Sequence, residues 1–199
     1  GQRGCRRGIA LVVHMHQASF RTGVGPMAAV AGAVAQKTAT AILRADPSPA
    51  GAAKEAIVEN GGDIYLALAA PATIALYAGK SPLSGSLALA VKPEQTPLAI
   101  CSSSSTMGHS LSFGSCDLAT VLSEDGALAD AAATMACNSV KSSDDIEGVL
   151  ARIMQVSGIR GAIIIKDDKF GMIGDLPELV AHKDCIIRDK ITRAPGVVV

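Results

Sequence analysis

Short apolar segments alternate with turn residues through the middle of this chain, and this alternation constrains its fold more than any other feature. Segments of this length, bounded by Gly, Pro, Asn, Asp or Ser, are typical of strands joined by short connections. Consecutive strands of this kind usually pair as antiparallel neighbours. We therefore expect strands at residues 56–58, 64–69, 73–78, 87–91, 98–102 and 118–122, and a closing hairpin formed by residues 162–165 and 170–173.

Segments rich in alanine and glycine precede and follow these strands. We expect helices over residues 27–43, around Asp130, and from a cap at Ser142 to residue 156, where Gly158 ends the last one. The sequence thus predicts an α+β fold, with a mainly antiparallel sheet and packed Ala/Gly-rich helices, as a single domain over residues 23–199. Residues 1–22 carry arginines before a short apolar run, and we interpret them as a leader or the remnant of a missing element, with a short strand at 9–13.

Charge, aromatic content and cysteine usage narrow the class of protein. Lys+Arg and Asp+Glu balance at 18 each, so no net charge indicates nucleic acid or an anionic membrane as a partner. Aromatic residues make up 3% and tryptophan is absent, which argues against a base-stacking platform. The uncharged run 64–79 contains Pro71 and is too short to span a membrane comfortably. Five scattered cysteines without a CxxC motif fit a reducing cytoplasm.

The first candidate binding motif is Asn60-Gly61-Gly62-Asp63, which directly follows an apolar segment. Adjacent glycines permit positive φ and let a ligand approach the bare backbone, as in a phosphate-facing turn at a strand end. An ordinary turn between two strands gives the same pattern, so the sequence leaves both interpretations open.

The second motif places Asp130 and Thr134 four residues apart in an alanine-rich, helix-favouring segment. Residues i and i+4 project from one helix face, so both oxygens could reach one hard cation such as magnesium. A solvated or capping role for Asp130 is the alternative, although a buried carboxylate in so apolar a segment would need a partner.

Two further segments carry candidate ligand contacts. A loop of consecutive hydroxyl residues follows the strand at 98–102, and we single out Ser102, Ser103, Gly108, His109 and Ser110. Hydroxyls and free amides suit phosphate or ribose oxygens, and His109 is a candidate proton donor, whereas a flexible connection is the alternative.

The glycine-rich start of the helix at 27–43 is the other segment, with Gly25 before it and Gly32 inside it. Gly32 costs about 1 kcal/mol relative to alanine in a helix. Gly32 is explained either by close packing of the helix against a sheet or by a helix N-terminus near a ligand anion.

The order of these motifs resembles the ApbE superfamily over residues 23–173, and is most similar to its uncharacterised ApbE-like branch. The stretches that carry the likeness are 23–32, 59–63, 102–103, 108–114 and 129–134. The best-known members are flavin transferases, which cut FAD and attach FMN to a protein threonine with magnesium. We expect an amino-terminal segment that such proteins usually carry to be absent or replaced here.

The resemblance implies a role for each matching residue. Asp130 and Thr134 would bind magnesium together with a backbone carbonyl of Val30 or Ala31. Residues 60–63 would contact the flavin nucleotide, and His109 would line the same cleft.

The chain also departs from the flavin transferases. Ala31 stands where they have a lysine and Gln36 where they have an aspartate. The loop at 110–114 lacks their acidic residue, their proline and their Thr-Gly pair. Two functions therefore remain open: a magnesium-dependent transferase acting on a flavin or nucleotide pyrophosphate, with an acceptor protein as partner, or a non-catalytic protein that binds such a ligand. A structural or oligomer-forming role is the third.

Overall fold

The computed structural model describes residues 2–45, 52–107 and 114–182, with side chains from residue 8 onward. The helical elements are α1 (Gln2–Thr22), the 3-10 helix η1 (Pro26–Ala29), α2 (Val30–Leu43), η2 (Pro93–Gln95), α3 (Gly126–Ser139), η3 (Ser143–Asp145) and α4 (Ile146–Ile153). The strands are β1 (Ala56–Asn60), β2 (Asp63–Ala67), β3 (Ala72–Leu76), β4 (Leu87–Val91), β5 (Leu98–Ser103), β6 (Leu118–Ser123), β7 (Ile159–Lys166), β8 (Lys169–Gly174) and β9 (Glu178–Ala181).

The strands form two sheets, one of six strands in the order β1-β2-β5-β6-β7-β8 and one of three in the order β3-β4-β9. Every pair of neighbouring strands is antiparallel. The predicted α+β class with a mainly antiparallel sheet is therefore confirmed. Each of the eight strands predicted from turn residues corresponds to a strand of the structure, with ends that differ by a few residues.

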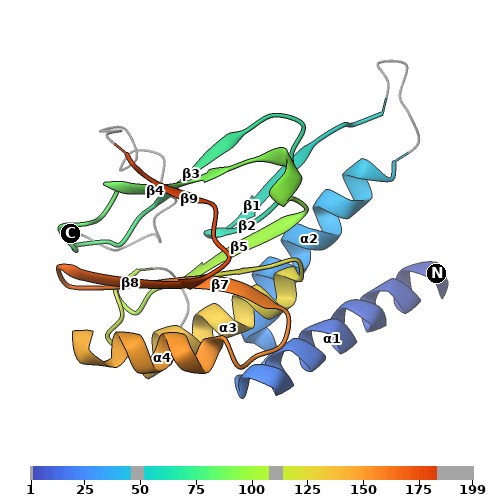
Figure 1. Cartoon of the computed structure of the whole chain (residues 1–199). Coiled ribbons are helices and arrows are strands. Elements are labelled where there is room, and N and C mark those ends of the chain that lie inside the picture. The colour runs from blue at the N-terminus through green and yellow to red at the C-terminus, as the bar shows by residue number, and fades with distance from the viewer. Residues whose placement is uncertain (1, 46–51, 108–113, 183–199) are drawn as a thin grey trace, which may run out of the picture.

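The large sheet lies between the helices on one face and the small sheet on the other (Figure 1). Successive side chains of a strand point to opposite faces. On β6, Ala119 and Val121 therefore pack against the helices, while Leu118 and Leu122 pack against the small sheet. On β7, Ile164 likewise packs against the helices and Ile163 against the small sheet. Both faces of the central strands are thus buried.

Helices α2 and α3 cross at two glycines. A Cβ atom added to Gly32 would lie 2.2 Å from the carbonyl oxygen of Gly126, and one added to Gly126 would lie 2.4 Å from that of Gly32. No side chain fits at either position, because backbone atoms leave no room to move. The proposed close-packing role of Gly32 is confirmed, but the partner is a helix and not a sheet.

The strand predicted at residues 9–13 is wrong, because these residues belong to the helix α1. The buried residues of this helix, Met15, Ala18, Ser19 and Thr22, follow a helical spacing and lie on the face that meets α3 and η1. Three apolar residues of the predicted strand, Ile9, Val12 and Val13, are exposed. Within the described residues, no helix is long and apolar enough to cross a membrane.

Candidate functional site

The Gly-Gly motif forms the two-residue turn of the β1–β2 hairpin, in which Asn60 pairs with Asp63. Gly61 has φ 67° and Gly62 has φ 100°, so both adopt the left-handed region that favours glycine. The amide of Gly62 donates to Oε1 of Glu59 over 2.7 Å. A Cβ atom at either glycine would meet nothing within 4 Å, so the turn faces open space.

The residues that flank this turn connect it to α2 and β5. Nδ2 of Asn60 donates to the carbonyl oxygen of Ala31 at the start of α2, over 3.3 Å. The carboxylate of Asp63 accepts from the amide of Ser102 on β5, over 3.1 Å. The turn is thereby held beside the first residues of α2, which lie about thirty residues earlier in the chain.

Asp130 approaches the same place from α3. Its Oδ2 atom accepts from the amide of Gly32 over 2.9 Å, and the amide of Ala31 also donates to this carboxylate. The first amides of a helix have no partner within it and carry partial positive charge. The N-terminus of α2 is therefore capped by a carboxylate of another helix. Asp130 is only 8% exposed, so its interpretation as a solvated residue is wrong.

Asp63 and Asp130 form a buried pair of carboxyl groups. Burial raises the pKa of Asp130 to about 6, against the lowering effect of its bonds from the Gly32 and Ala31 amides. Burial, and then the charge of Asp130, raise the pKa of Asp63 well above its usual range. Within the described part of the chain, neither carboxylate forms an ion pair with a lysine, arginine or histidine. The pair therefore favours binding of a proton or a cation.

The carboxylate oxygens of this pair are the kind of ligand that a hard cation prefers. Thr134 lies one turn after Asp130 on α3 and is half-buried. That these two residues share one cation stays a prediction. The described residues contain no group of three or more His, Cys, Asp or Glu side chains arranged to hold a metal ion. Magnesium is usually held by one or two carboxylates together with water and substrate phosphates, so a two-carboxylate site with a nearby hydroxyl fits it.

The structure brings Asn60, Asp63, Gly32 and Asp130 together, and it leaves other predicted residues elsewhere. Ser102 contributes its amide to the cluster, but its hydroxyl lies 2.9 Å from that of Thr120. Ser103 pairs with Ala119 in the sheet, and Gly25 precedes η1 with open space around it. The candidates Gly108, His109 and Ser110 lie outside the described residues, so the convergence of their loop with the hairpin turn stays a prediction.

Two residues in or beside the site, Cys101 and Gln36, were not predicted from the sequence as site residues. Cys101 is buried, and its thiol is hydrogen-bonded to the carboxyl group of Asp63. Burial raises the pKa of this thiol well above its usual range, and the charges of Asp63 and Asp130 raise it further. Gln36 donates to the carbonyl of Glu124 and accepts from the amide of Gly126, over 3.3 and 3.0 Å. Gln36 therefore fastens α2 to the start of α3, a role that only the packing of the two helices reveals.

These features define an α+β protein with a buried two-carboxylate site between a hairpin turn and the N-terminus of a helix. The family model described as AbpE bacteria matches residues 4–168, and the chain belongs to this family.

Curated relatives include several UPF0280 proteins. That of Methanocella arvoryzae is 40% identical over 92% of this chain and 71% of its own length. That of Methanospirillum hungatei is 37% identical over 97% of this chain and 76% of its own length. That of Methanosarcina acetivorans is 38% identical over 92% of this chain and 70% of its own length.

Proposed function

We propose that Asp63, Asp130 and Thr134 hold a magnesium ion, and that the adjacent turn and α2 start bind the phosphates of a flavin or another nucleotide. The observation that carries this proposal is the buried pair Asp63 and Asp130. Burial raises the pKa of both carboxyl groups, the charge of Asp130 raises that of Asp63 further, and neither forms an ion pair with a basic side chain among the described residues. A divalent cation stabilises both carboxylates at once. The Gly61-Gly62 turn faces open space beside this pair, so a ligand could approach its backbone there.

A bound magnesium ion would neutralise charge on the phosphates of the ligand. The chain's own residues supply the positioning. Asn60 holds the turn against α2, and the amide of Ser102 fixes the carboxylate of Asp63. The N-terminus of α2 orients Asp130, so both carboxylates are in place before a ligand arrives.

The resemblance to the ApbE superfamily supports a flavin as the nucleotide and a cytoplasmic transferase as the activity. Two observations favour the second candidate, a non-catalytic flavin- or nucleotide-binding protein. Gln36, which replaces an aspartate of the flavin transferases, has both ends of its amide bonded to the start of α3. Ala31, which replaces their lysine, offers no side-chain charge to a phosphate.

Magnesium binding tests the proposal directly. We expect calorimetry to detect binding of magnesium to the protein, and Asp130→Asn or Asp63→Asn to abolish it, because each removes one of the two charges that attract the ion. Asn at 130 can still accept from the Gly32 amide, so the change isolates the charge. Asp144→Asn, at an exposed position, is the matched control and should bind like the parent. Equal binding by all four proteins would contradict the site.

Flavin transfer separates the two candidate functions. With FAD, magnesium and an acceptor sequence of the flavin transferases, we expect transfer of FMN about a thousandfold slower than by those enzymes, because the positions of their lysine and aspartate carry no charge here. Mass spectrometry of the acceptor measures the transfer. A rate comparable with the flavin transferases would overturn this expectation. Binding of FAD and magnesium without transfer would favour the non-catalytic protein.

A further inference from the structure

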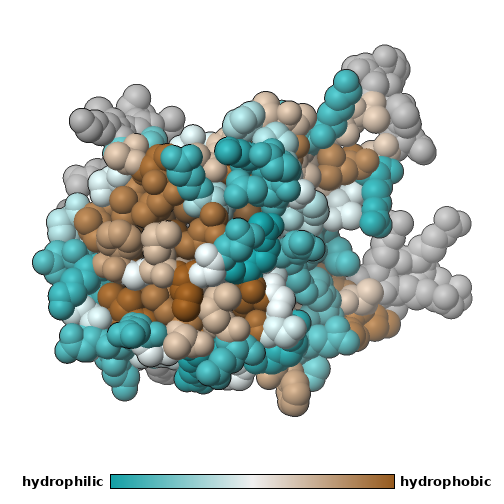
Figure 2. Space-filling model, viewed as in Figure 1, coloured by the Kyte–Doolittle hydropathy of each residue, from teal (hydrophilic) through white to brown (hydrophobic). Residues whose placement is uncertain are grey.

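Cys101 is a buried thiol beside the candidate site, and the proposed function gives it no role. It lies on β5, whose side chains alternate between the two faces of the large sheet. Leu98 and Ile100 pack toward the small sheet, while Ala99 and Cys101 pack toward the helices. The apolar area that Figure 2 shows over β8 and β9 of Figure 1 lies on the other side of the large sheet. Cys101 therefore points into the space between β5 and the start of α3.

Two acceptors lie within reach of this thiol. Sγ of Cys101 is 3.6 Å from the carbonyl oxygen of Gly126, and the thiol is hydrogen-bonded to the carboxyl group of Asp63. A thiol has one proton to donate, so it bonds to one of the two at a time. The carboxylate is the stronger acceptor because it is charged. Burial raises the pKa of the thiol, which therefore keeps this proton at neutral pH.

The carboxylate of Asp63 receives donors from two consecutive residues of β5. Its Oδ1 atom accepts from the amide of Ser102 over 3.1 Å, and the thiol of Cys101 is the second donor. Burial and the charge of Asp130 raise the pKa of Asp63 well above its usual range, and the two hydrogen bonds act in the opposite direction. Both donors therefore favour the charged form of Asp63, which is the form that binds a cation.

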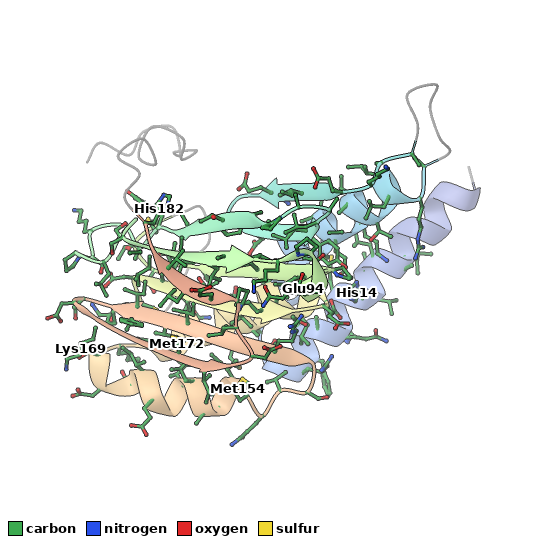
Figure 3. The ribbon with its side chains drawn as sticks, turned by 45° about the horizontal axis from the view of Figure 1, so that its top comes forward. His14, Glu94, Met154, Lys169, Met172 and His182 are labelled. Atoms are coloured by element: carbon green, nitrogen blue, oxygen red, sulfur yellow. The ribbon has the colours of Figure 1, made fainter. Side chains whose placement is uncertain are left out.

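No basic side chain replaces these donors within the described residues. Figure 3 shows two histidines, His14 on α1 and His182 after β9. His14 is ion-paired with Asp125 over 2.8 Å, and none of the ion pairs of the described residues includes Asp63. Among these residues, the amide of Ser102 and the thiol of Cys101 are the groups that hold the Asp63 carboxylate.

We propose that Cys101 is a positioning residue of the cation site: its thiol donates to the Asp63 carboxylate and fixes the orientation in which this carboxylate meets the ion. The role rests on the proposed magnesium site. A carboxylate held by the Ser102 amide alone can turn about that bond, whereas a second donor fixes its plane. Groups that hydrogen-bond to a metal ligand orient it, and their loss lowers metal affinity by about 10- to 100-fold.

Calorimetric titration of the full chain with magnesium tests the proposal. We expect Cys101→Ala to bind magnesium about tenfold more weakly than the parent, because the carboxylate loses its second donor. Cys101→Ser should stay within about threefold of the parent, because a hydroxyl also donates. Cys116→Ala is the matched control and should bind like the parent. Cys116 is equally buried, but its thiol donates to the carbonyl oxygen of Ile165 on β7.

A thiol that only fills space gives a different result. Cys101→Ala would then have a lower thermal midpoint than the parent but the same magnesium affinity, and this outcome would overturn the proposal. Binding by Cys101→Ser as weak as that by Cys101→Ala would overturn it as well, because the affinity would then not depend on a donor at this position.

The infrared S–H stretching band reports on the bond itself. The band of Cys101 is identified by its loss in Cys101→Ser. It should move to higher frequency in Asp63→Asn, and also when magnesium is added to the parent, because both changes remove charge from the acceptor. The same band in the parent and in Asp63→Asn would overturn the proposal, whether or not the protein binds magnesium. A band that moves in Asp63→Asn, in a parent that binds no magnesium, would confirm the bond but overturn the proposed magnesium site, and with it the role of Cys101 toward a cation.

Discussion

Replacing Gly32 by alanine will lower the free energy of unfolding by about 3 kcal/mol or more, because the new methyl group meets backbone atoms that cannot rotate away. Its Cβ would lie 2.2 Å from the carbonyl oxygen of Gly126 and 2.9 Å from the Cβ of Asp130. Either α2 and α3 move apart, or the structure unfolds where the two helices cross. Thermal denaturation followed by circular dichroism should show a midpoint lower by about 10 °C.

Gly148→Ala is the matched control for this substitution. Gly148 also lies inside a helix, α4, but a Cβ atom there would meet nothing within 4 Å. We expect this variant to be as stable as the parent or more stable by up to about 1 kcal/mol, because alanine favours the helix. If both variants lose the same stability, the close approach of α2 and α3 at Gly32 is wrong.

The strands were predictable because their boundaries are set by neighbouring residues. The Gly61-Gly62 and Asp167-Asp168 turns mark hairpins in the sequence itself, and the apolar residues between turns form the strands. The same reasoning failed for α1, where the exposed residues Ile9, Val12 and Val13 give an apolar run that looks like a strand. The burial of Met15 and Ala18 against α3 favours a helix over a strand in this segment. The neighbouring residues in the sequence do not reveal this packing.

The candidate site was predictable in its parts but not in its arrangement. Asp130 and Thr134 share a helix, so their spacing alone places them one turn apart. The pairing of Asp63 with Asp130 depends on how β2 packs beside α3, across more than sixty residues of sequence. The close packing of Gly32 likewise depends on Gly126 of α3, and the sequence alone does not place these two glycines side by side.

The substitution Asp130→Asn will stabilise the cation-free protein at neutral pH, on the order of 2 kcal/mol. Burial raises the pKa of Asp130 from 3.8 to about 6, so the folded state binds the proton more tightly than the unfolded state. The stability of the parent therefore falls as the pH rises from 3.8 to about 6 and stays lower above it. Asparagine resembles the protonated acid and does not incur this loss. Urea denaturation with a chelator, at acidic and at neutral pH, measures the difference.

Saturating magnesium should reverse this order. A cation that binds only the folded parent stabilises it in proportion to the logarithm of the ion concentration over the dissociation constant, and the Asp130→Asn variant lacks the charge that holds the ion. The parent then becomes the more stable protein at neutral pH, while Asp144→Asn, at its exposed position, follows the parent in both conditions. If magnesium leaves the order unchanged while the chelated proteins behave as expected, the two carboxyl groups share a proton and not a metal ion. If Asp130→Asn is instead less stable than the parent with the chelator, the charge of Asp130 at the N-terminus of α2 outweighs the cost of its burial.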